Sequence, residues 1–547
     1  MKVLGISGSE QHAAAAVAID GSIVAAAEEQ SFARVPRIGY RHTGGFPLAA
    51  IDACLTRAQI ALTEVDRIVA VEDAGELREA GVPPIPAAHG GAFGPGGHDA
   101  LERALRARTL DSVAPALADA RQLAAVCDDE HLLVLVLPTD GVRPAVFERR
   151  GSAFALLHTH AADQLSCAIT RMAQALGLTS SDRYDAIERV ASLGAPGDPA
   201  AFGKAIAWNP DRGVTVSDEE FTKAIDRLDG GALSPDWSLD VRRQHDRQAA
   251  ASGFCARVSA LVVDMARSLL ERPGATRVGL AGGLFASREL AAAVTGALGD
   301  AAIIAPVPEA PGRALGAALE SLPRGGLLQS LALGPEFTEQ EVKLALENCR
   351  LDYLYEPDWS RLMTRVSKML SRGTVVAWFQ GPMGFGPRSI GTRGILCDPS
   401  NKYARENVNC FLLHGSADDP LPVSMTAADM EVCLDQPARS PFLAIDAKVH
   451  TPWRDKLRAA IDHRQSIPVQ SVTEAQSPAF LELLQLHRTR SGVPGLINVP
   501  LSGANEPGAC TPRDAIRTTF SSAIDALVIG RFLLMKDYWL LRSGADL

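Results

Sequence analysis

The sequence lacks paired cysteines. Its nine cysteines are scattered singly, and no two of them form a CxxC pair: Cys54, Cys127, Cys167, Cys255, Cys349, Cys397, Cys410, Cys433 and Cys510. This absence excludes a zinc ribbon and a thioredoxin-type redox motif. The opening residues, MKVLGISGSEQ, contain no apolar core of the kind that a signal peptide needs. The odd cysteine count and the missing signal-type segment predict a protein of the reducing cytoplasm.

Long hydrophobic runs and an excess of positive charge are missing as well. No run of 18 apolar residues occurs, so we expect no membrane span. The formal net charge is −10, which gives no electrostatic reason to bind a nucleic acid or an anionic membrane. Neither the phosphate-binding motif of P-loop kinases nor the GxSxG motif of serine hydrolases is found. A small molecule is therefore the expected partner.

The composition is that of a large folded protein of the α/β class. Of the 547 residues, 47% are hydrophobic, 22% are charged and only 5% are aromatic. A chain of this length buries a large core without disulfides or metal ions. Short apolar segments at residues 2–7, 13–19 and 22–27 predict three strands joined by tight turns. Apolar residues at helical spacing predict helices over 99–126 and 514–527.

A linker-like change in composition near residue 330 predicts a domain boundary. The run PRGGLLQS resembles a linker, and the helix expected after it has a threonine cap. We therefore expect two domains, over residues 1–330 and 331–547. No internal repeat is visible in the sequence.

Three predicted strands run directly into glycine turns, at residues 6–9, 140–141 and 282–283. Backbone amides in such turns bind phosphate groups when they converge on them. The order of the three turns resembles the architecture of actin-like and sugar-kinase ATPases. The residues expected to face a phosphate are Ser7, Gly8, Gly141, Gly282 and Gly283.

The most specific stretch is WFQGPMGFGPRSIGTRGILCDPS, at residues 378–400. A strand enters a loop in which Gly381 and Gly386 allow the backbone to approach a ligand closely. Arg388 and Arg393 offer planar donor groups that suit phosphate or carboxylate. The pattern predicts an anion site. The alternative is a surface loop that happens to carry arginines.

This stretch resembles the signature of the NodU/CmcH family of carbamoyltransferases, and further segments follow in the family's order. They are LGISGSEQHAAAAVAIDGSIVAAAEEQSFAR, GFPLAAIDACL, VGLAGGLFAS, ALGAALE, SGVPGLINVPLSGANEPGACTPRDAI and DALVIGRFLL. The resemblance extends over nearly the whole chain. It implies an actin-like N-terminal domain followed by a YrdC-like C-terminal domain.

The resemblance also implies a reaction in two steps. The C-terminal domain would combine ATP with carbamoyl phosphate into carbamoyl adenylate, and the N-terminal domain would pass the carbamoyl group to an acceptor hydroxyl or amine. ATP and Mg²⁺ are thus the implied cofactors. His12 and Asp140 fall on the implied catalytic positions, and Asn498 joins the glycines and arginines of the signature loop in the donor site.

The transition-metal site of the family has no counterpart here. The segments PALADARQLA and EAPGRALGAA place Ala116, Asp119 and Ala310 where the family has two histidines and an aspartate. We therefore expect no transition metal. A substitute carboxylate site formed by Asp119 and Glu309 is the alternative.

The donor loop also departs from the family. Pro382 and Ser400 replace two arginines, Gly384 replaces a glutamate, and Asp418 and Asp419 lie where the family has a basic run. A hydrogen bond to a charged group contributes about 1.5–3 kcal/mol, so several such losses would weaken the binding of an anionic donor.

Two further histidine groups lie outside these motifs. His158 and His160 form an HxH pair, which would face one side on a strand and so suit a metal, or would lie at the surface before a helix. His89 and His98 flank a glycine-rich segment at 90–97, which is either a lid or a loop tip.

Three functions remain open. The first is a divergent carbamoyltransferase of natural-product biosynthesis that acts on a small-molecule acceptor. The second is a catalytically inactive family member that supports an active paralogue, as a homodimer or as a heteromer with that paralogue. The third is a transferase that forms a different acyl adenylate without a metal.

Overall fold

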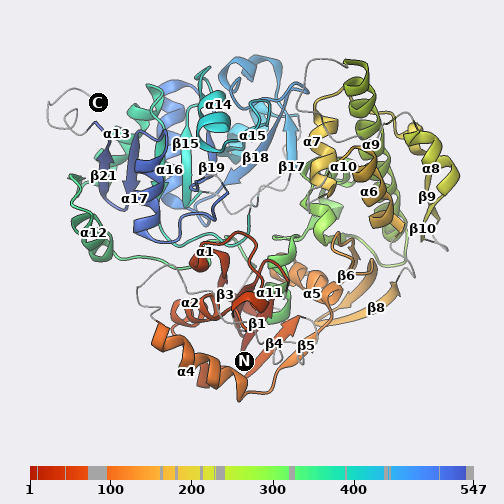
Figure 1. The fold of residues 1–547 in the computed structure, drawn as a ribbon, viewed down its shortest axis with the longest axis horizontal. Helices are drawn as coiled ribbons and strands as arrows, with labels where there is room; N and C mark the ends of the chain where they lie inside the picture. The colour runs from red at the N-terminus through yellow and green to blue at the C-terminus, as the bar shows by residue number, and fades with distance from the viewer. Residues whose placement is uncertain are drawn as a thin grey trace.

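The computed structural model describes residues 1–8, 10–43, 45–71, 95–159, 164–178, 183–209, 213–226, 228, 241–319, 327–387, 391–435, 442, 445–503 and 505–537, with the side chains of 95–97 and 241–244 left out. Within these residues the strands form two five-stranded sheets, one nine-stranded sheet and a small two-stranded sheet. Figure 1 shows them with helices packed around each large sheet. The α/β class predicted from the sequence is confirmed.

The first sheet has the strand order β3-β2-β1-β4-β5. Strands β1, β2 and β3 are antiparallel neighbours, whereas β4 and β5 run parallel to β1. The strands are β1 Lys2–Ser7, β2 Ala14–Ile19, β3 Ser22–Glu28, β4 Arg67–Val71 and β5 Asp111–Val113. The first three strands lie where the sequence predicted them. Both faces of β1 are buried, which explains its nearly continuous apolar sequence.

The second sheet repeats this arrangement. Read as β8-β7-β6-β11-β12, it has three antiparallel neighbours followed by two strands parallel to β6. Its strands are β6 His131–Val136, β7 Ala145–Arg150, β8 Ala153–Thr159, β11 Val278–Ala281 and β12 Ala302–Ile304. The two sheets thus share one topology, although no internal repeat is visible in the sequence. A duplicated sheet of this order confirms the predicted actin-like architecture.

Two short helices connect the two units. Helix α5 (Pro115–Arg121) leads from the first sheet into the second, and α11 (Arg313–Ala318) returns to pack on β1. The helices touch closely, because a Cβ on Gly316 of α11 would lie 1.8 Å from the carbonyl oxygen of Ala118 in α5. Only glycine fits at this crossing. The two connections therefore form one tightly packed junction between the two sheets (Figure 1).

The third sheet contains the C-terminal part of the chain. Its nine strands have the order β13-β21-β20-β14-β15-β19-β16-β18-β17, with parallel and antiparallel neighbours. The strands are β13 Leu354–Tyr355, β14 Val376–Phe379, β15 Arg393–Cys397, β16 Val423–Thr426, β17 Ile445–Lys448, β18 Ser466–Val472, β19 Gly495–Pro500, β20 Ala526–Ile529 and β21 Phe532–Met535.

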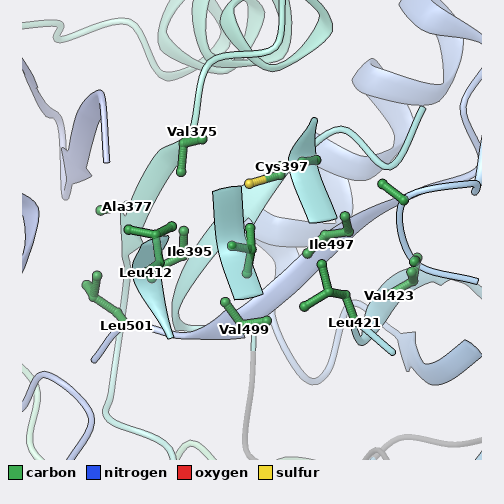
Figure 2. Packing of buried hydrophobic residues seen from close by; sticks show 14 of the residues in the cluster. Val375, Ala377, Ile395, Cys397, Leu412, Leu421, Val423, Ile497, Val499 and Leu501 are labelled. Carbon is green, nitrogen blue, oxygen red and sulfur yellow. The ribbon is translucent and has the colours of Figure 1, made fainter. Parts of the chain in front are cut away.

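Side chains from the centre of this sheet form a continuous apolar core. Figure 2 shows Ala377 of β14, Ile395 of β15, Val423 of β16 and Val499 of β19 in one layer. All four are fully or almost fully buried. At about 25 cal/mol per Å² of apolar surface, burial of this layer is the main force that holds these strands together.

Helices complete the three parts. They are α1 Gln30–Ala33, α2 Leu48–Ala58, α4 Pro95–Arg106, α6 Gln164–Ala175, α7 Arg183–Ser192, α8 Asp218–Ile225, α9 Val241–Leu270, α10 Arg288–Leu298, α12 Glu339–Asn348, α13 Trp359–Ser371, α14 Ala404–Glu406, α15 Ala427–Cys433, α16 Pro478–Ser491 and α17 Pro512–Ser521. The remaining strands are β9 Ile206–Asn209 and β10 Gly213–Val216. Thr338 caps α12 with a capping box, as predicted.

One helix meets the length and composition of a membrane span. It covers His245–Leu270 within α9, and 61% of its most apolar window is buried inside the protein. A core helix passes the same test, so the prediction that no segment crosses a membrane stays a prediction.

Two predicted helices are too long. The segment 99–126 is not one helix, because α4 ends at Arg106 and the edge strand β5 precedes α5. The segment 514–527 begins inside α17 but runs into β20. In both cases a strand of three or four residues pairs in a sheet, and so short a strand gives little periodic signal.

Candidate functional site

The turns that follow β6 and β11 lie side by side. Leu137, directly after β6, donates its backbone N–H to Ala281 at 2.9 Å and accepts one from Leu284 at 3.0 Å. Thr139 lies against Gly283, since a Cβ on that glycine would be 2.5 Å from Thr139 Oγ1. The structure thus brings four predicted residues to one edge of the second sheet: Asp140, Gly141, Gly282 and Gly283.

Gly282 is required at this edge for two reasons. Its φ of +94° lies in a region that other residues rarely adopt. A Cβ there would also lie 2.6 Å from the carbonyl carbon of Leu137. The backbone after β11 therefore lies so close to the backbone after β6 that no side chain fits between them at Gly282.

The corresponding turn of the first unit holds the other predicted residues. Ser7 ends β1 and is fully buried, and the carbonyl of Gly8 accepts the N–H of Tyr40 at 3.1 Å. His12 is half-buried, has a φ of +58°, and donates its backbone N–H to Arg37 at 3.2 Å. Ser7, Gly8 and His12 thus lie on one turn between β1 and β2.

Arg313 lies between two carboxylates at the junction of the two units. Its Nε is 3.1 Å from each oxygen of Asp119, and its Nη2 is 3.0 Å from Asp119 Oδ2. Nη1 donates to Asp140 Oδ2 at 2.6 Å and Nη2 to Asp140 Oδ1 at 3.2 Å. Asp119 comes from α5, Arg313 from α11 and Asp140 from the turn after β6. The guanidinium therefore binds both carboxylates with two contacts or more.

Burial sets the charge states of this trio. Desolvation raises the pKa of Asp119 to about 6, although Arg313 favours its charged form. Burial also opposes ionisation of Asp140, but the charge and hydrogen bonds of Arg313 outweigh it and hold the pKa of Asp140 below its usual range. The two neighbours raise the pKa of Arg313 against its own burial, so it stays a cation. Two acids thus share one permanent positive charge.

The residues of this junction do not fit the transition metal that the family resemblance implies. Ala116 and Ala310 carry no ligand atom, and both oxygens of Asp119 contact Arg313. Among the described residues, no three histidine, cysteine, aspartate or glutamate side chains gather where they would hold a metal ion. The alternative site of Asp119 and Glu309 stays a prediction, although Arg313 contacts both oxygens of Asp119.

Glu28 joins the signature loop to the first unit. Its Oε1 accepts the backbone N–H of Gly386 at 3.1 Å, and its Oε2 accepts Gln30 Nε2 at 2.5 Å. Burial raises the pKa of Glu28 to about 7, partly opposed by these hydrogen bonds. A Cβ on Gly386 would also lie 2.9 Å from Val307, so the loop packs directly against the N-terminal half.

Arg393 has a different environment from the one predicted. Its guanidinium donates to backbone carbonyls: Nη2 to Pro335 at 2.7 Å and to Gly381 at 3.4 Å, and Nη1 to Ala509 at 3.4 Å and to Cys510. It also lies 4.2 Å from the centre of the Phe379 ring. These contacts make Arg393 a residue that holds the loop together. Its partner Arg388 lies outside the described residues.

Asn498 lies in a buried polar network and not at an open surface. Its Nδ2 donates to Ser424 Oγ at 3.1 Å, and that hydroxyl donates to Gln470 Oε1 at 2.9 Å. The network crosses β19, β16 and β18 beneath the signature loop, because a Cβ on Gly391 would lie 3.9 Å from Gln470 Oε1. Asn498 therefore supports the sheet on which the loop rests.

A cavity of about 280 Å³ opens beside Gly381. Phe337, Trp359, Phe379 and Arg531 are among its lining residues. Gly381 is itself one of the lining residues, and Glu339 faces the hollow together with Arg531. The aromatic walls suit a small ligand with a flat group.

The other predicted residues are dispersed. Asp418 is exposed and Asp419 is half-buried, with burial raising the pKa of Asp419. His158 is exposed on the edge strand β8, and His98 lies in α4. His160, His89 and residues 90–94 lie outside the described residues.

Sequence reasoning missed the role of Arg313. Arg313 lies in the segment EAPGRALGAA, which the sequence analysis considers only for the metal ligand that Ala310 replaces. The available signal was its surroundings: an arginine between glycine and alanines in an apolar helix is buried, and a buried charge requires a partner.

The chain is similar to known carbamoyltransferases and nodulation proteins. The family model described as "Carbamoyltransferase C-terminus" matches residues 367–536. Over 97% of its length the chain is 25% identical to nodulation protein NolNO of Sinorhizobium fredii, 80% of which is covered.

Two further relatives match over shorter stretches. An uncharacterised protein of Synechocystis is 31% identical over 37% of each chain. The 3'-hydroxymethylcephem-O-carbamoyltransferase of Amycolatopsis lactamdurans is 26% identical over 34% of this chain and 36% of its own. The matches to these two proteins therefore span little more than a third of their length.

Proposed function

We propose that the chain, as a member of the NodU/CmcH family of carbamoyltransferases, transfers a carbamoyl group from carbamoyl phosphate, by way of carbamoyl adenylate, to a hydroxyl or amine of a small-molecule natural product. The observation that carries the proposal is the hydrogen bond from Gly386 to Glu28. It joins the signature loop, which lies inside the matched family region, to the unit that bears the glycine turns. This contact supports a donor site and an acceptor site in adjoining parts of one molecule.

The first step would use the signature loop. Water would first cleave carbamoyl phosphate into carbamate and phosphate. The carbamate oxygen would then attack the α-phosphorus of ATP, which gives carbamoyl adenylate and releases pyrophosphate, and Mg²⁺ would accompany the ATP phosphates. Arg388 is the arginine we assign to the anionic donor, because the donor groups of Arg393 contact backbone carbonyls. Adenylation supplies a better leaving group than phosphate for attack by a neutral alcohol.

The second step would use the turns of the N-terminal half. The backbone amides of Gly8, Gly141, Gly282 and Gly283 are the groups we assign to the phosphate of the adenylate. The low pKa of Asp140 makes it a weak base. We therefore assign proton removal from the acceptor to His12, and an orienting role to Asp140. No step is routed through a metal ion, since the junction residues do not fit one.

A second candidate is a family member without catalysis that supports an active paralogue. The specific observation that favours it is the environment of Arg393, whose Nη1 and Nη2 both donate to the protein's own backbone carbonyls. The acidic pair Asp418 and Asp419 in the donor segment adds repulsion toward an anionic donor. No separate observation favours the third function, a transferase that forms a different acyl adenylate without a metal.

Titration calorimetry of the full chain tests the proposal. ATP, carbamoyl phosphate and both together are injected into the wild type, the Arg388→Ala variant and the Arg490→Ala variant. Arg490 is exposed on α16, so its loss changes the charge equally without touching the loop. Binding that Arg388→Ala abolishes and Arg490→Ala retains supports carbamoyl transfer. No heat with any ligand from folded protein supports the non-catalytic candidate.

A further inference from the structure

The guanidinium of Arg313 has the surroundings of a bound cation. Two carboxylates converge on it from different segments, and its Nε, Nη1 and Nη2 all donate to them. The Arg313 side chain is 10% exposed and that of Asp119 only 1% exposed, so solvent screens the Asp119 contact weakly. Asp140 is 42% exposed and forms the open side of the trio.

The charges around Arg313 do not balance. Two carboxylates face one positive charge, and burial has already raised the pKa of Asp119 above its usual value. A divalent cation would neutralise both acids, whereas the arginine neutralises one. The two carboxylates of Asp119 and Asp140 are arranged as in a cation site, and the cation that fills it is the guanidinium of Arg313.

A neutral oxygen lies close to the same junction. Gln122 follows Asp119 by one helical turn and is fully buried. Within the part of the chain that the structure describes, neither its Oε1 nor its Nε2 has a hydrogen-bond partner. Its Oε1 packs against Gly312, the residue before Arg313, because a Cβ on that glycine would be 2.4 Å away. A buried amide without a hydrogen-bond partner costs free energy. The Gln122 oxygen is therefore available to bind a ligand at this junction.

We infer that Arg313 is a built-in cation that replaces a metal ion at the junction of the two units, and that Asp119 and Asp140 form a latent divalent-cation site which the arginine keeps filled. The inference concerns the junction alone and does not depend on carbamoyl transfer. Because α5 and α11 are the two connections between the units, the fixed cation also holds their relative position without any dependence on metal supply.

Metal binding by variants of the full chain tests this inference. Wild type, Arg313→Ala, Arg313→Gln and the double variant Asp119→Asn/Arg313→Ala are stripped with a chelator and dialysed against Mn²⁺. Bound manganese and the midpoint of thermal unfolding are then measured. We expect no stoichiometric manganese on the wild type and about one ion per chain on Arg313→Ala.

The thermal measurement gives an independent readout. Manganese should raise the Tm of Arg313→Ala by about 2–4 °C and leave the wild type and the double variant unchanged. If Arg313→Ala folds only when manganese is present, the inference is supported equally. Should Arg313→Ala fail to fold in either condition, Arg313→Gln, which keeps more of the side chain but removes its charge, decides the matter in the same two measurements.

Two results would overturn the inference. One is a wild-type chain that binds one manganese ion in competition with Arg313. The other is a folded Arg313→Ala or Arg313→Gln variant whose Tm and metal content do not respond to manganese. Carbamoyl transfer is not measured in any arm, so the proposed function can fail while this inference stands.

Discussion

Two buried arginines stabilise the two halves of the candidate site in different ways. Arg313 binds the carboxylates of Asp119 and Asp140, whereas Arg393 donates to backbone carbonyls from three separate segments. The first arrangement neutralises charge. The second one crosslinks loops, since each carbonyl would otherwise need water.

Replacing Arg393 by lysine should lower the stability of the chain. A lysine keeps the charge but offers no planar fork, so contacts to Pro335, Gly381 and Cys510 cannot all be kept. We expect a loss of about 2–4 kcal/mol in the free energy of unfolding, measured by urea denaturation. The exposed Arg490→Lys variant should stay within about 0.5 kcal/mol of wild type. Equal stability of both variants would contradict a crosslinking role.

Glu28 should give the stability a pH dependence of known sign. Its pKa is about 7 in the folded chain against an ordinary 4.5, so between these values only the folded state keeps the proton. Stability therefore falls as the pH rises through this interval, by up to about 1.4 kcal/mol per pH unit. In Glu28→Gln that part of the slope should disappear.

Urea denaturation at pH 5, 6, 7 and 8 measures this difference. Glu29 shifts in the same direction and is present in both proteins, so its contribution cancels in the comparison. Parallel pH profiles for wild type and Glu28→Gln would show that Glu28 is ionised in the folded chain at these pH values.

The sequence identifies residue types at the site better than it identifies their partners. Asp140, Gly141, Gly282 and Gly283 lie at one sheet edge, because short motifs at the ends of neighbouring strands meet there. The partners of Arg393 come from residues 335, 381, 509 and 510, which no local pattern connects. Sequence alone therefore predicts that an arginine in such a motif binds an anion, and only the structure shows that it binds backbone carbonyls.

Among the elements, the crossing of α5 and α11 decides how the two units meet. Gly316 allows α11 to lie on the carbonyl of Ala118, and Gly5 of β1 accepts the same helix from the other side. The crossing carries Asp119 and Arg313 on its two helices. Its precision thus determines whether the guanidinium reaches both carboxylates.

Gly316→Ala should be strongly destabilising. The added Cβ would lie 1.8 Å from a backbone oxygen that cannot move without shifting α5. We expect a loss of about 3 kcal/mol or more by urea denaturation. Gly508→Ala is the matched control, since a Cβ there meets no atom within 4 Å. A tolerated Gly316→Ala would mean that the helices are farther apart than described.

Elements with a strong apolar pattern follow from the sequence, and short edge strands do not. Strands β1 to β3 lie where they were predicted because both their apolar runs and their turns are distinct. Strand β5 has three residues, Asp111–Val113, and exists because β4 offers it an edge. Tertiary pairing of this kind leaves no mark in a local pattern.

At the scale of the whole molecule, partly exposed ion pairs join the C-terminal sheet to the second unit. The C-terminal sheet contacts the second unit through Arg464 and Glu289 at 2.7 Å and through Arg288 and Asp446 at 2.9 Å. The duplicated sheet order of the N-terminal half was expected from the family resemblance, whereas the repeat itself is invisible because the two copies share topology and not sequence.

Arg464→Met should loosen the C-terminal part from the second unit. It leaves Glu289 without its partner and removes the contact to the Ala191 carbonyl. We expect calorimetric unfolding to separate into two transitions, the lower one shifted down by about 2–4 °C. Arg267→Met, which removes an exposed pair within α9, should keep the wild-type profile. A single unshifted transition in Arg464→Met would show that this pair does not couple the parts.

The central claim, that this chain activates and transfers a carbamoyl group, is tested most directly by pyrophosphate release. Full-length protein is incubated with ATP and Mg²⁺, with and without carbamoyl phosphate, beside the Arg388→Ala variant. The account predicts pyrophosphate that requires carbamoyl phosphate and disappears in Arg388→Ala. Folded wild-type protein that binds neither ligand and releases no pyrophosphate would contradict it and leave the non-catalytic partner as the function.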